Sequence, residues 1–428
     1  MEYQRGRIEQ NEYDQDKDET RPKPEPDPEI SEKEAAERLE EIHKYLRDRA
    51  ARRDVTAQTE TESGQQLDWI PIESQTPDGT IASPPSEGGI DLSDRDEPAD
   101  YSMGREVRPY EITEFELQRE GAKLGPKGTV PVVRRDVSRI HPVGTLQDFL
   151  SKHDRAPRIL PDDDPREFAY PEDSSSHKYA FSAQDVTCYG GEGSINAWWP
   201  YVEWSNEFSL GQVALARGSG SGKQTVEAGH QVYRDLYGDW VPHLFIFYTT
   251  NGYTSSGDNK GGYNQDVDGW VQYSGTIYPE AKSSPLSQFG GTQYIMSLKW
   301  QLWQGNWWLK VNDVWVGYYP ASLFSISGLR SQAEKIAWYG EVVDSAHAGT
   351  TATDMGNGHW PYEGWQHCAF MYQLYYQSST SGTLSRYIPS SVWASNNLCY
   401  DIEGHFNNTG SWGPYCWWGG SGRNSACP

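Results

Sequence analysis

The 428-residue sequence is short of basic residues and of long apolar runs. Its 37 Lys and Arg are outnumbered by 61 Asp and Glu, which gives a formal net charge of −24. Binding to polyphosphate requires Lys and Arg to displace counterions, so this balance argues against a nucleic-acid partner and against an anionic membrane surface. No window approaches the run of about eighteen apolar residues that a membrane-spanning helix needs. Residues 1–30 also lack the apolar core of a signal peptide.

Cysteine is scarce as well, with five residues and no Cys-x-x-Cys pair. Cys399, Cys416 and Cys427 lie close to the C-terminus, where a chain end with little core is often held by a disulfide. The alternative is a set of reduced, buried thiols. The cysteine spacing alone leaves both possibilities open.

Charged and aromatic residues divide the chain into two parts. Residues 1–180 hold 42 of the 61 acidic residues and 26 of the 37 basic ones, whereas seventeen of the eighteen Trp lie from Trp198 onward. We expect residues 1–60 to be an acidic, largely disordered segment with one helix at about 31–53, where Ser31 and Glu34 form a capping box. A polar region with short apolar patches follows over 61–150, and then a Pro- and Asp-rich linker over 151–177.

From residue 178 onward, short runs of β-branched and aromatic residues are broken by Gly, Asn, Asp and Ser. Turn sequences such as Gln304-Gly305-Asn306 separate neighbouring runs by a few residues, which is the spacing of β-hairpins. Long helical periodicity is absent. The pattern predicts an all-β domain over 178–428, built as a two-layer antiparallel sandwich or a barrel.

Several motifs of known chemistry are incomplete in this sequence. The loop from Gly218 to Lys223 lacks the spacing of a phosphate-binding loop and is predicted to be a flexible hairpin tip. Asp266 and Asp268 resemble part of a calcium loop, but Gly275 stands where a bidentate Glu is needed, so a solvated turn is predicted. Zinc-hydrolase and serine-hydrolase spacings are missing. We therefore expect no metal and no cofactor.

Two glutamates stand out because the second part of the chain holds only 19 acidic residues. Glu227 lies in the apolar run 226–233 and Glu341 in the run 335–343, and a buried carboxylate requires a partner or a raised pKa. Each Glu alone is compatible with a carboxylate that accepts hydrogen bonds across a sheet. A close pair is different, because two neighbouring carboxylates do not ionise together easily and so provide an acid and a base at one site.

At these residues the sequence resembles the neprosin family of glutamic peptidases. The resemblance spans roughly 178–428 and weaker parts lie upstream, in 69–79 and 125–135. It implies a β-sandwich catalytic domain preceded by an activation or pro-region at 61–150, with Glu227 and Glu341 as the catalytic pair and Cys399 bonded to Cys427. It also implies cleavage of peptides after proline at acidic pH. The matching stretches are 204–213, 227–239, 244–249, 306–309, 316–320, 338–342, 353–358, 399–402 and 418–427.

Four further residues are substrate or oxyanion candidates. Strand alternation places Gln231 and Tyr233 on the same face as Glu227, where they are candidates to hydrogen-bond the tetrahedral oxygen. Tyr339 stands where the family usually has Gly and is expected to reshape the cleft. His230 stands where the family usually has Trp and is expected to add positive charge in acid.

The remaining expectations concern partners and location. The expected substrate is a peptide or protein, including proline-rich ones, and the enzyme is expected to be a monomer. The excess of carboxylates in 1–180 suggests that the protein's own N-terminal segment is an inhibitor released as pH falls. The resemblance implies an extracellular protein, and Asn407 begins the single N-glycosylation sequon. The alternative hypothesis is a non-catalytic secreted sandwich that binds carbohydrate or protein through exposed aromatic side chains.

Overall fold

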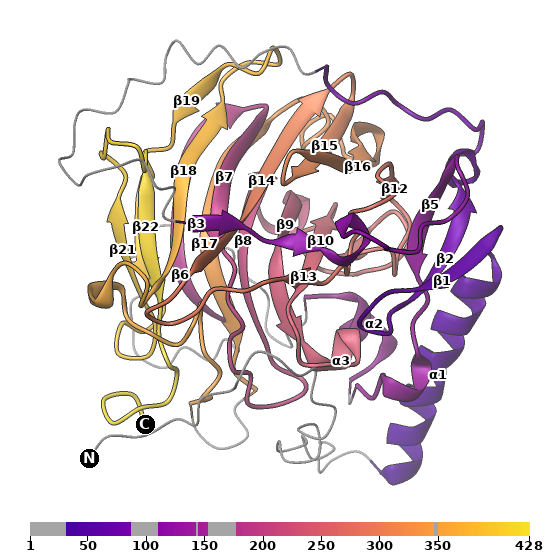
Figure 1. The fold of residues 1–428 in the computed structure, drawn as a ribbon, viewed down its shortest axis with the longest axis horizontal. Coiled ribbons are helices and arrows are strands. Elements are labelled where there is room, and N and C mark those ends of the chain that lie inside the picture. Colours follow the sequence, from indigo (N-terminus) through magenta and orange to yellow (C-terminus); the bar gives the residue numbers. More distant parts are fainter. Residues whose placement is uncertain (1–30, 87–109, 143, 153–176, 346–349) are drawn as a thin grey trace.

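The computed structural model describes residues 31–86, 110–142, 144–152, 177–345 and 350–428. Its centre is a sandwich of two large β-sheets (Figure 1). One sheet has seven strands in the order β11-β10-β9-β8-β17-β6-β20, and all of its pairings are antiparallel. Its strands are β6 (His177–Cys188), β8 (Phe208–Arg217), β9 (Gln224–Tyr233), β10 (His243–Thr249), β11 (Gly261–Tyr263), β17 (Ala333–Val343) and β20 (Ser391–Ala394).

The second sheet has ten strands, eight of them in the order β12-β16-β15-β14-β7-β18-β22-β21. β19 adds to β18, and β3 from the N-terminal part pairs in parallel with β14. The predicted all-β, two-layer antiparallel sandwich is therefore confirmed. The strands are β3 (Tyr110–Ile112), β7 (Gly190–Asn196), β12 (Val271–Gln272), β14 (Gln293–Trp303), β15 (Asn306–Val311), β16 (Val314–Pro320), β18 (Ala369–Gln377), β19 (Leu384–Arg386), β21 (Asp401–His405) and β22 (Tyr415–Gly419).

The main core lies between the two sheets and is built largely from aromatic and β-branched side chains. Trp418 of β22 packs against β17 of the opposite sheet, because a Cβ at Gly340 would lie 2.3 Å from the Trp418 ring. The glycine beside Glu341 therefore faces the core and makes room for an indole. Trp300, Trp307 and Trp338 are fully buried in the same layer.

The N-terminal part begins with α1 (Glu32–Ala51), which confirms the helix predicted at about 31–53. The Ser31 side chain accepts a hydrogen bond from the Glu34 backbone N–H at 3.2 Å, as the capping pattern predicts, and Ile42 and Leu46 are buried. A three-stranded sheet that the sequence analysis did not predict lies beside α1. It contains β1 (Ala57–Glu60), β2 (Gln66–Pro71) and β5 (Thr129–Val133).

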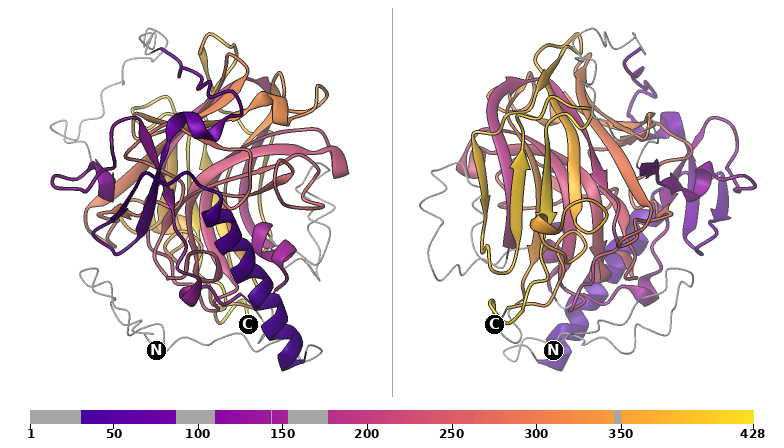
Figure 2. Two further views of the ribbon diagram at one scale, coloured as in Figure 1. Left: turned by 90° about the vertical axis from the view of Figure 1, so that its right-hand side faces the viewer. Right: turned by 60° about the vertical axis from the view of Figure 1, so that its left-hand side comes forward.

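These N-terminal elements cover one end of the sandwich, away from β21 and β22 (Figure 1), and Figure 2 shows α1 in front when that end faces the viewer. β4 (Glu114–Phe115) pairs with β13 (Ser283–Ser284), and the short helix α2 (Leu146–Leu150) follows. A third short helix, α3 (Arg234–Tyr237), comes directly after β9. Most of the predicted linker, 153–176, and the segment 1–30 predicted to be disordered lie outside the described residues. Within the described residues, no helix has the length and apolarity needed to cross a membrane.

Candidate active site

The two predicted glutamates lie on neighbouring parts of one face of the seven-stranded sheet. β8 separates β9, which carries Glu227, from β17, which carries Glu341. Directly paired residues of antiparallel strands share a face, and Glu227 pairs with Ala214 while Glu341 pairs with Leu210. Ala214 and Leu210 are four residues apart on β8, so both carboxylates project from the same side, and both glutamates are fully buried.

The side chain of Lys152 lies between the two carboxylates and contacts both. Its ammonium group is paired with Oε2 of Glu227 and lies 3.6 Å from Oε2 of Glu341. It also donates to Oε1 of Gln212 at 2.7 Å. The rings of Phe245 and Phe247 lie beside it, with centroids 5.1 and 5.5 Å from Nζ. One buried cation thus joins two glutamates that are 114 residues apart in the chain.

Each glutamate also has its own hydrogen-bond partners. Oε1 of Glu227 accepts from the hydroxyl groups of Tyr253 at 2.6 Å and Thr225 at 2.8 Å. Oε1 of Glu341 lies 2.6 Å from Nδ1 of His177 and 3.5 Å from the hydroxyl oxygen of Tyr179. In each glutamate, Oε1 contacts neighbouring side chains of the sandwich while Oε2 faces the Lys152 ammonium. This arrangement fixes the direction of both carboxyl groups.

Lys152 is positioned by α2, and the sequence analysis missed it. Thr145 and Asp148 form a capping box that starts the helix, and Phe149 and Leu150 are buried. The helix ends at Leu150, and Lys152 follows immediately with a fully buried side chain. The sequence did contain a pattern that could have found it, namely the capping box followed by the two apolar residues, which indicates a short helix packed on the core. We had predicted a polar linker from residue 151.

Gln231 and Tyr233 lie on the predicted face of β9, farther along the strand than Glu227. The Gln231 amide donates to the Tyr263 hydroxyl at 3.2 Å and accepts from the Tyr237 hydroxyl at 2.9 Å. The Tyr233 ring packs against Phe208 and Tyr263, and burial raises its pKa well above the usual range. At about 3.3 Å per residue, these side chains start roughly 13 and 20 Å from Glu227. Gln231 pairs with Leu210, which pairs with Glu341 on its other side, so Gln231 and Glu341 lie in one row across β8.

Tyr339 lies beside Glu341, in an aromatic cluster on the same face of the sheet. Its ring centroid is 5.1 Å from that of Phe181 and 6.0 Å from that of Tyr179, and Trp393 packs on the same rings. The cluster forms an apolar wall next to the Glu341 carboxylate. Tyr339 is part of this wall, and its effect on the shape of the cleft stays a prediction.

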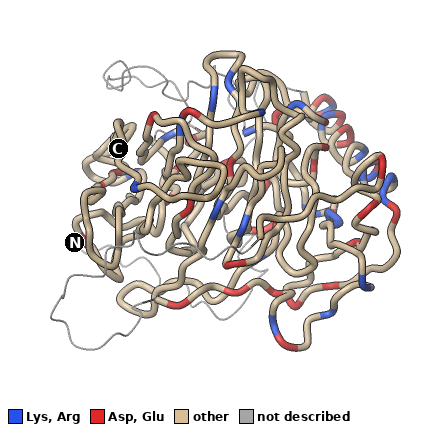
Figure 3. The backbone as a smooth tube through the Cα atoms, turned by 90° about the horizontal axis from the view of Figure 1, so that it is seen from above, with Lys and Arg blue, Asp and Glu red and all other residues tan. Residues whose placement is uncertain are grey.

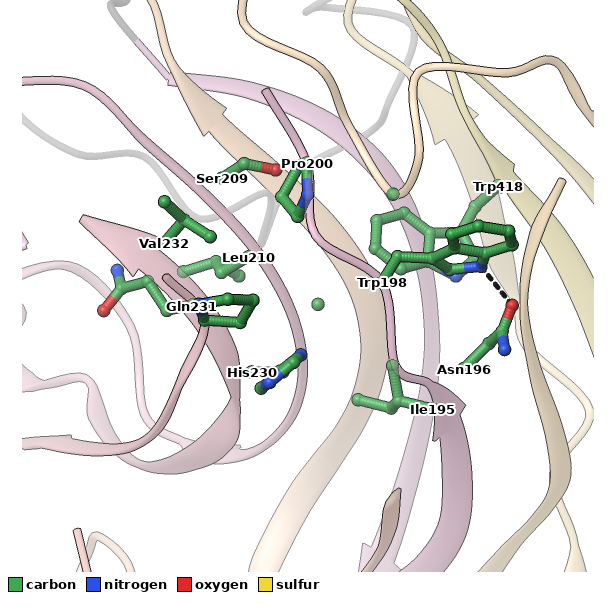
Figure 4. A pocket seen from close by; sticks show the side chains of 13 residues that line it. Ile195, Asn196, Trp198, Pro200, Ser209, Leu210, His230, Gln231, Val232 and Trp418 are labelled. Atoms are coloured by element: carbon green, nitrogen blue, oxygen red, sulfur yellow. Dashed lines mark hydrogen bonds between the residues drawn. The ribbon is translucent and has the colours of Figure 1, made fainter. Parts of the chain in front are cut away.

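His230 lies on the opposite face of β9 from Glu227 and lines a cavity of about 20 Å³ between the two sheets (Figure 4). Ile195, Asn196 and Trp418 line the same cavity from the other sheet. Its Nε2 lies 3.3 Å from the Ser283 hydroxyl. Burial, and to a lesser extent His243, lowers the pKa of His230 to about 3. The expectation of added positive charge in acid is therefore wrong, because a buried imidazole resists protonation.

The lowered pKa of His230 makes a prediction about acid stability. The unfolded state takes up a proton near pH 6.5 while the folded state does not until about pH 3, so stability is lost as pH falls through this window. Between pH 6.5 and 4 we expect this histidine to contribute a loss of roughly 3 kcal/mol. Urea unfolding should therefore show a smaller acid-induced loss of unfolding free energy in His230→Gln than in the unsubstituted protein. The exposed control His141→Gln should show the same loss as the unsubstituted protein. Equal losses in His230→Gln and the unsubstituted protein would show that His230 does not carry this effect.

The N-terminal region, which we define as the described residues 31–152, meets the sandwich through arginines. Arg49 donates to Asp258 and Asp268 at 2.8 Å each, and Arg135 contacts Asp266 at 2.5 Å and Glu280 at 3.1 Å. Figure 3 shows how acidic and basic residues gather at this end, along α1. At these ion pairs the N-terminal region supplies the cations and the sandwich supplies the carboxylates.

Asp266 and Glu280 are both buried beside Arg135. Residues 264–266 form the predicted turn, but Asp266 is buried against Arg135 instead of being solvated. Burial raises the pKa of Glu280 to about 8 despite the adjacent Arg135.

The cysteines take no part in the site. Cys399 and Cys427 form the disulfide that the resemblance implied, with Cα atoms 5.4 Å apart, while Cys188, Cys368 and Cys416 are buried thiols. Burial raises the pKa of Cys188 and Cys416 to about 12, so neither supplies a thiolate near neutral pH. In the part of the chain that the structure describes, no three His, Cys, Asp or Glu side chains converge as metal ligands would. Asn407 is exposed.

The fold is a β-sandwich that buries two glutamates beside one lysine. The Neprosin family model matches residues 205–421, which is half of the chain and includes both glutamates. The chain belongs to the Neprosin family and is a glutamic-type peptidase, a hydrolase whose substrate is a peptide or protein.

Solved structures with a related arrangement of strands are distant. Scytalido-glutamic peptidase, solved with a transition state analog inhibitor, is 8% identical with a TM-score of 0.29, covering 57% of this chain and 98% of that one. SCP-B of the eqolisin family, in complex with the tripeptide Ala-Ile-His, is 7% identical with a TM-score of 0.28 and the same coverage. CG-16, a homodimeric agglutinin from chicken liver, is 10% identical with a TM-score of 0.21, covering 38% and 93%. These values are too low to indicate an activity.

Proposed function

We propose that this protein is an acid-active endopeptidase that hydrolyses peptide bonds with a water held between Glu227 and Glu341. The observation that carries the proposal is the single ammonium group of Lys152, which lies against both carboxylates at a buried point of the sheet. A position that touches both carboxyl groups suits a water that one of them deprotonates. The same position suits a scissile amide that the other protonates.

The reaction balances with these two groups alone. One carboxylate removes a proton from the water as its oxygen attacks the scissile carbonyl carbon, and the carbonyl electron pair moves to the carbonyl oxygen. When the tetrahedral intermediate collapses, the C–N bond breaks and the leaving nitrogen takes the proton held by the other carboxyl group. The pair then exchanges one proton and returns to its starting state. The two carboxyl groups titrate as a coupled pair, so the roles of base and acid belong to the pair and are not assigned to either Glu alone.

Cleavage after proline is the proposed specificity. The aromatic wall beside Glu341, formed by Tyr179, Phe181, Tyr339 and Trp393, supports it. A pyrrolidine ring is apolar and flat enough to pack on such a wall, and apolar walls with a few polar groups are typical of ligand sites. Other apolar side chains fit the same surface, so the preference has to be measured on a set of peptides.

The N-terminal region is the proposed inhibitor of this site. Lys152 covers both glutamates, and α1 and Arg135 attach the same region to the sandwich through ion pairs. Carboxylates that pair with cations favour the docked state while they are ionised, so docking is lost as pH falls and they take up protons. We propose an extracellular, monomeric enzyme that stays latent until acid releases this region.

The test of the proposed function is cleavage of peptides by the full chain. The protein is incubated in acid with two peptides that differ only by proline or alanine at one internal position, and products are identified by mass spectrometry. We expect cleavage after proline to exceed cleavage at the alanine position. Absence of any cleavage, with retained binding to glycans or proteins, would instead favour the non-catalytic sandwich. Equal cleavage of both peptides would remove the proline preference and leave the peptidase.

A further inference from the structure

Gln212 occupies the centre of the face that carries the two glutamates. It lies on β8, between β9 and β17, and pairs directly with Gly229 on one side and Tyr339 on the other. Gly229 is two residues from Glu227, and Tyr339 is two residues from Glu341. Because paired residues share a face, the Gln212 side chain starts midway on the diagonal between the two carboxylates. A side chain at Gly229 would disturb it, since a Cβ there would lie 2.9 Å from the Gln212 Cβ.

The Gln212 amide is fully buried, and only one of its two polar atoms has a hydrogen-bond partner among the described residues. Its Oε1 accepts a hydrogen bond from the Lys152 ammonium at 2.7 Å. Its Nε2 is buried and has no hydrogen-bond partner among the described residues. Buried polar atoms are nearly always paired, so an unpaired amide N–H donor is an exception that calls for an explanation. Its presence at the carboxylate pair indicates a group kept for something that binds there.

The present hydrogen bond shows which point in space this amide reaches. The ammonium is a pure donor, so it selects the amide oxygen. The last torsion of a glutamine side chain is broad and roughly two-fold, so the oxygen and nitrogen can exchange places by rotation. When an anionic oxygen replaces the ammonium, the same rotation turns the amide N–H toward it. No movement of β8 is required.

We propose that Gln212 is a catalytic residue whose amide N–H hydrogen-bonds the oxyanion of the tetrahedral intermediate. This inference rests on the proposed Glu227 and Glu341 mechanism and adds to it the group that stabilises the new negative charge. As water attacks, the carbonyl π electrons become a lone pair on oxygen, and Gln212 donates a hydrogen bond without transferring its proton. In a site closed to water such a donor is strong, because it is held in place before the charge develops.

The substitution Gln212→Met tests this role, because it keeps the length of the side chain and removes the amide. For the acid-treated full chain acting on a peptide that it cleaves, we expect kcat to fall roughly 10²–10³-fold, the usual effect of losing one oxyanion donor. KM should change less than about threefold, because the ground-state carbonyl is uncharged. The control Gln301→Met, on β14 of the other sheet, should keep wild-type kcat. A kcat of Gln212→Met within about threefold of wild type would overturn the proposal.

A pair of inhibitors separates catalysis from structure. One peptide carries a phosphinate in place of the scissile amide, and its tetrahedral anionic oxygen mimics the intermediate; the other carries a reduced CH₂–NH bond without that oxygen. We expect Gln212→Met to weaken binding of the phosphinate peptide by about the same factor by which it lowers kcat. Binding of the reduced peptide should weaken by less than about threefold. Equal weakening of both would assign Gln212 a structural role only.

The result is also distinguishable from failure of the carboxylate mechanism. If Glu227→Gln and Glu341→Gln are inactive while Gln212→Met is fully active, only the oxyanion role is lost. If both Glu variants remain active, the proposed function itself fails, whatever Gln212 does.

Discussion

Neither Glu227→Gln nor Glu341→Gln should cleave a peptide that the acid-treated full chain cleaves. Each substitution keeps the shape of the side chain and its hydrogen bonds to Tyr253 or His177, but removes the group that accepts or donates a proton. A general acid or base contributes roughly 10²–10⁴-fold, and loss of one member stops both proton transfers in a coupled pair. We therefore expect kcat to fall by at least about 10³-fold in each variant.

Glu192→Gln is the matched control for this experiment. Glu192 lies on β7 of the ten-stranded sheet and pairs with Lys299 at 3.0 Å, so it is a mostly buried glutamate outside the site. It should retain kcat within about threefold of wild type. The double variant Glu227→Gln/Glu341→Gln should be no worse than the poorer single variant, since groups that act as a unit are not additive. Substantial activity in both single variants would remove the pair from the mechanism.

Lys152→Ala and Lys152→Met should shorten or abolish the lag before activity after transfer to acid. The ammonium is the cation of the N-terminal region that both glutamates contact, and neither variant supplies it. Removing one partner of a buried ion pair typically costs about 3–5 kcal/mol, which weakens docking by far more than tenfold. We expect the lag in peptide cleavage to shorten at least about tenfold, measured by continuous assay from the moment of acidification.

The two variants differ in what they test. Lys152→Met keeps most of the side-chain volume and removes the charge, whereas Lys152→Ala also empties the space above the glutamates. Lys123→Met, an exposed lysine of the same N-terminal region, is the control and should show the wild-type lag. A wild-type lag in both Lys152 variants would mean that latency rests on other contacts, such as those of Arg49 and Arg135.

The fold and the glutamate pair could be predicted because they depend on local patterns. Short β-branched and aromatic runs with turn residues between them specify strands, and a Glu within an apolar run is costly enough to mark a site. Strand alternation also placed Gln231 and Tyr233 on the face of Glu227, but it does not give their distance along the strand, and their roles stay predictions. The same logic applied to β8 would have found Gln212, a lone amide in a run of small and apolar residues.

Other features depend on tertiary contacts that the sequence pattern does not contain. Lys152 looks like the start of a polar linker, because its burial depends on α2 docking against the sandwich. Asp266 looks like a turn residue, because its partner Arg135 is 131 positions away. The total acidity of the N-terminal part does not indicate which few residues meet the sandwich, and at these pairs that part supplies the cations.

The pH dependence of kcat/KM for the acid-treated chain tests the carboxylate pair most directly, because one member must be ionised and the other protonated. We predict a bell-shaped profile with both limbs in the acidic range and no activity at pH 8. A rate that keeps rising through pH 7 to a plateau would contradict the account, since it would require a base that titrates near neutrality rather than two glutamates sharing a proton.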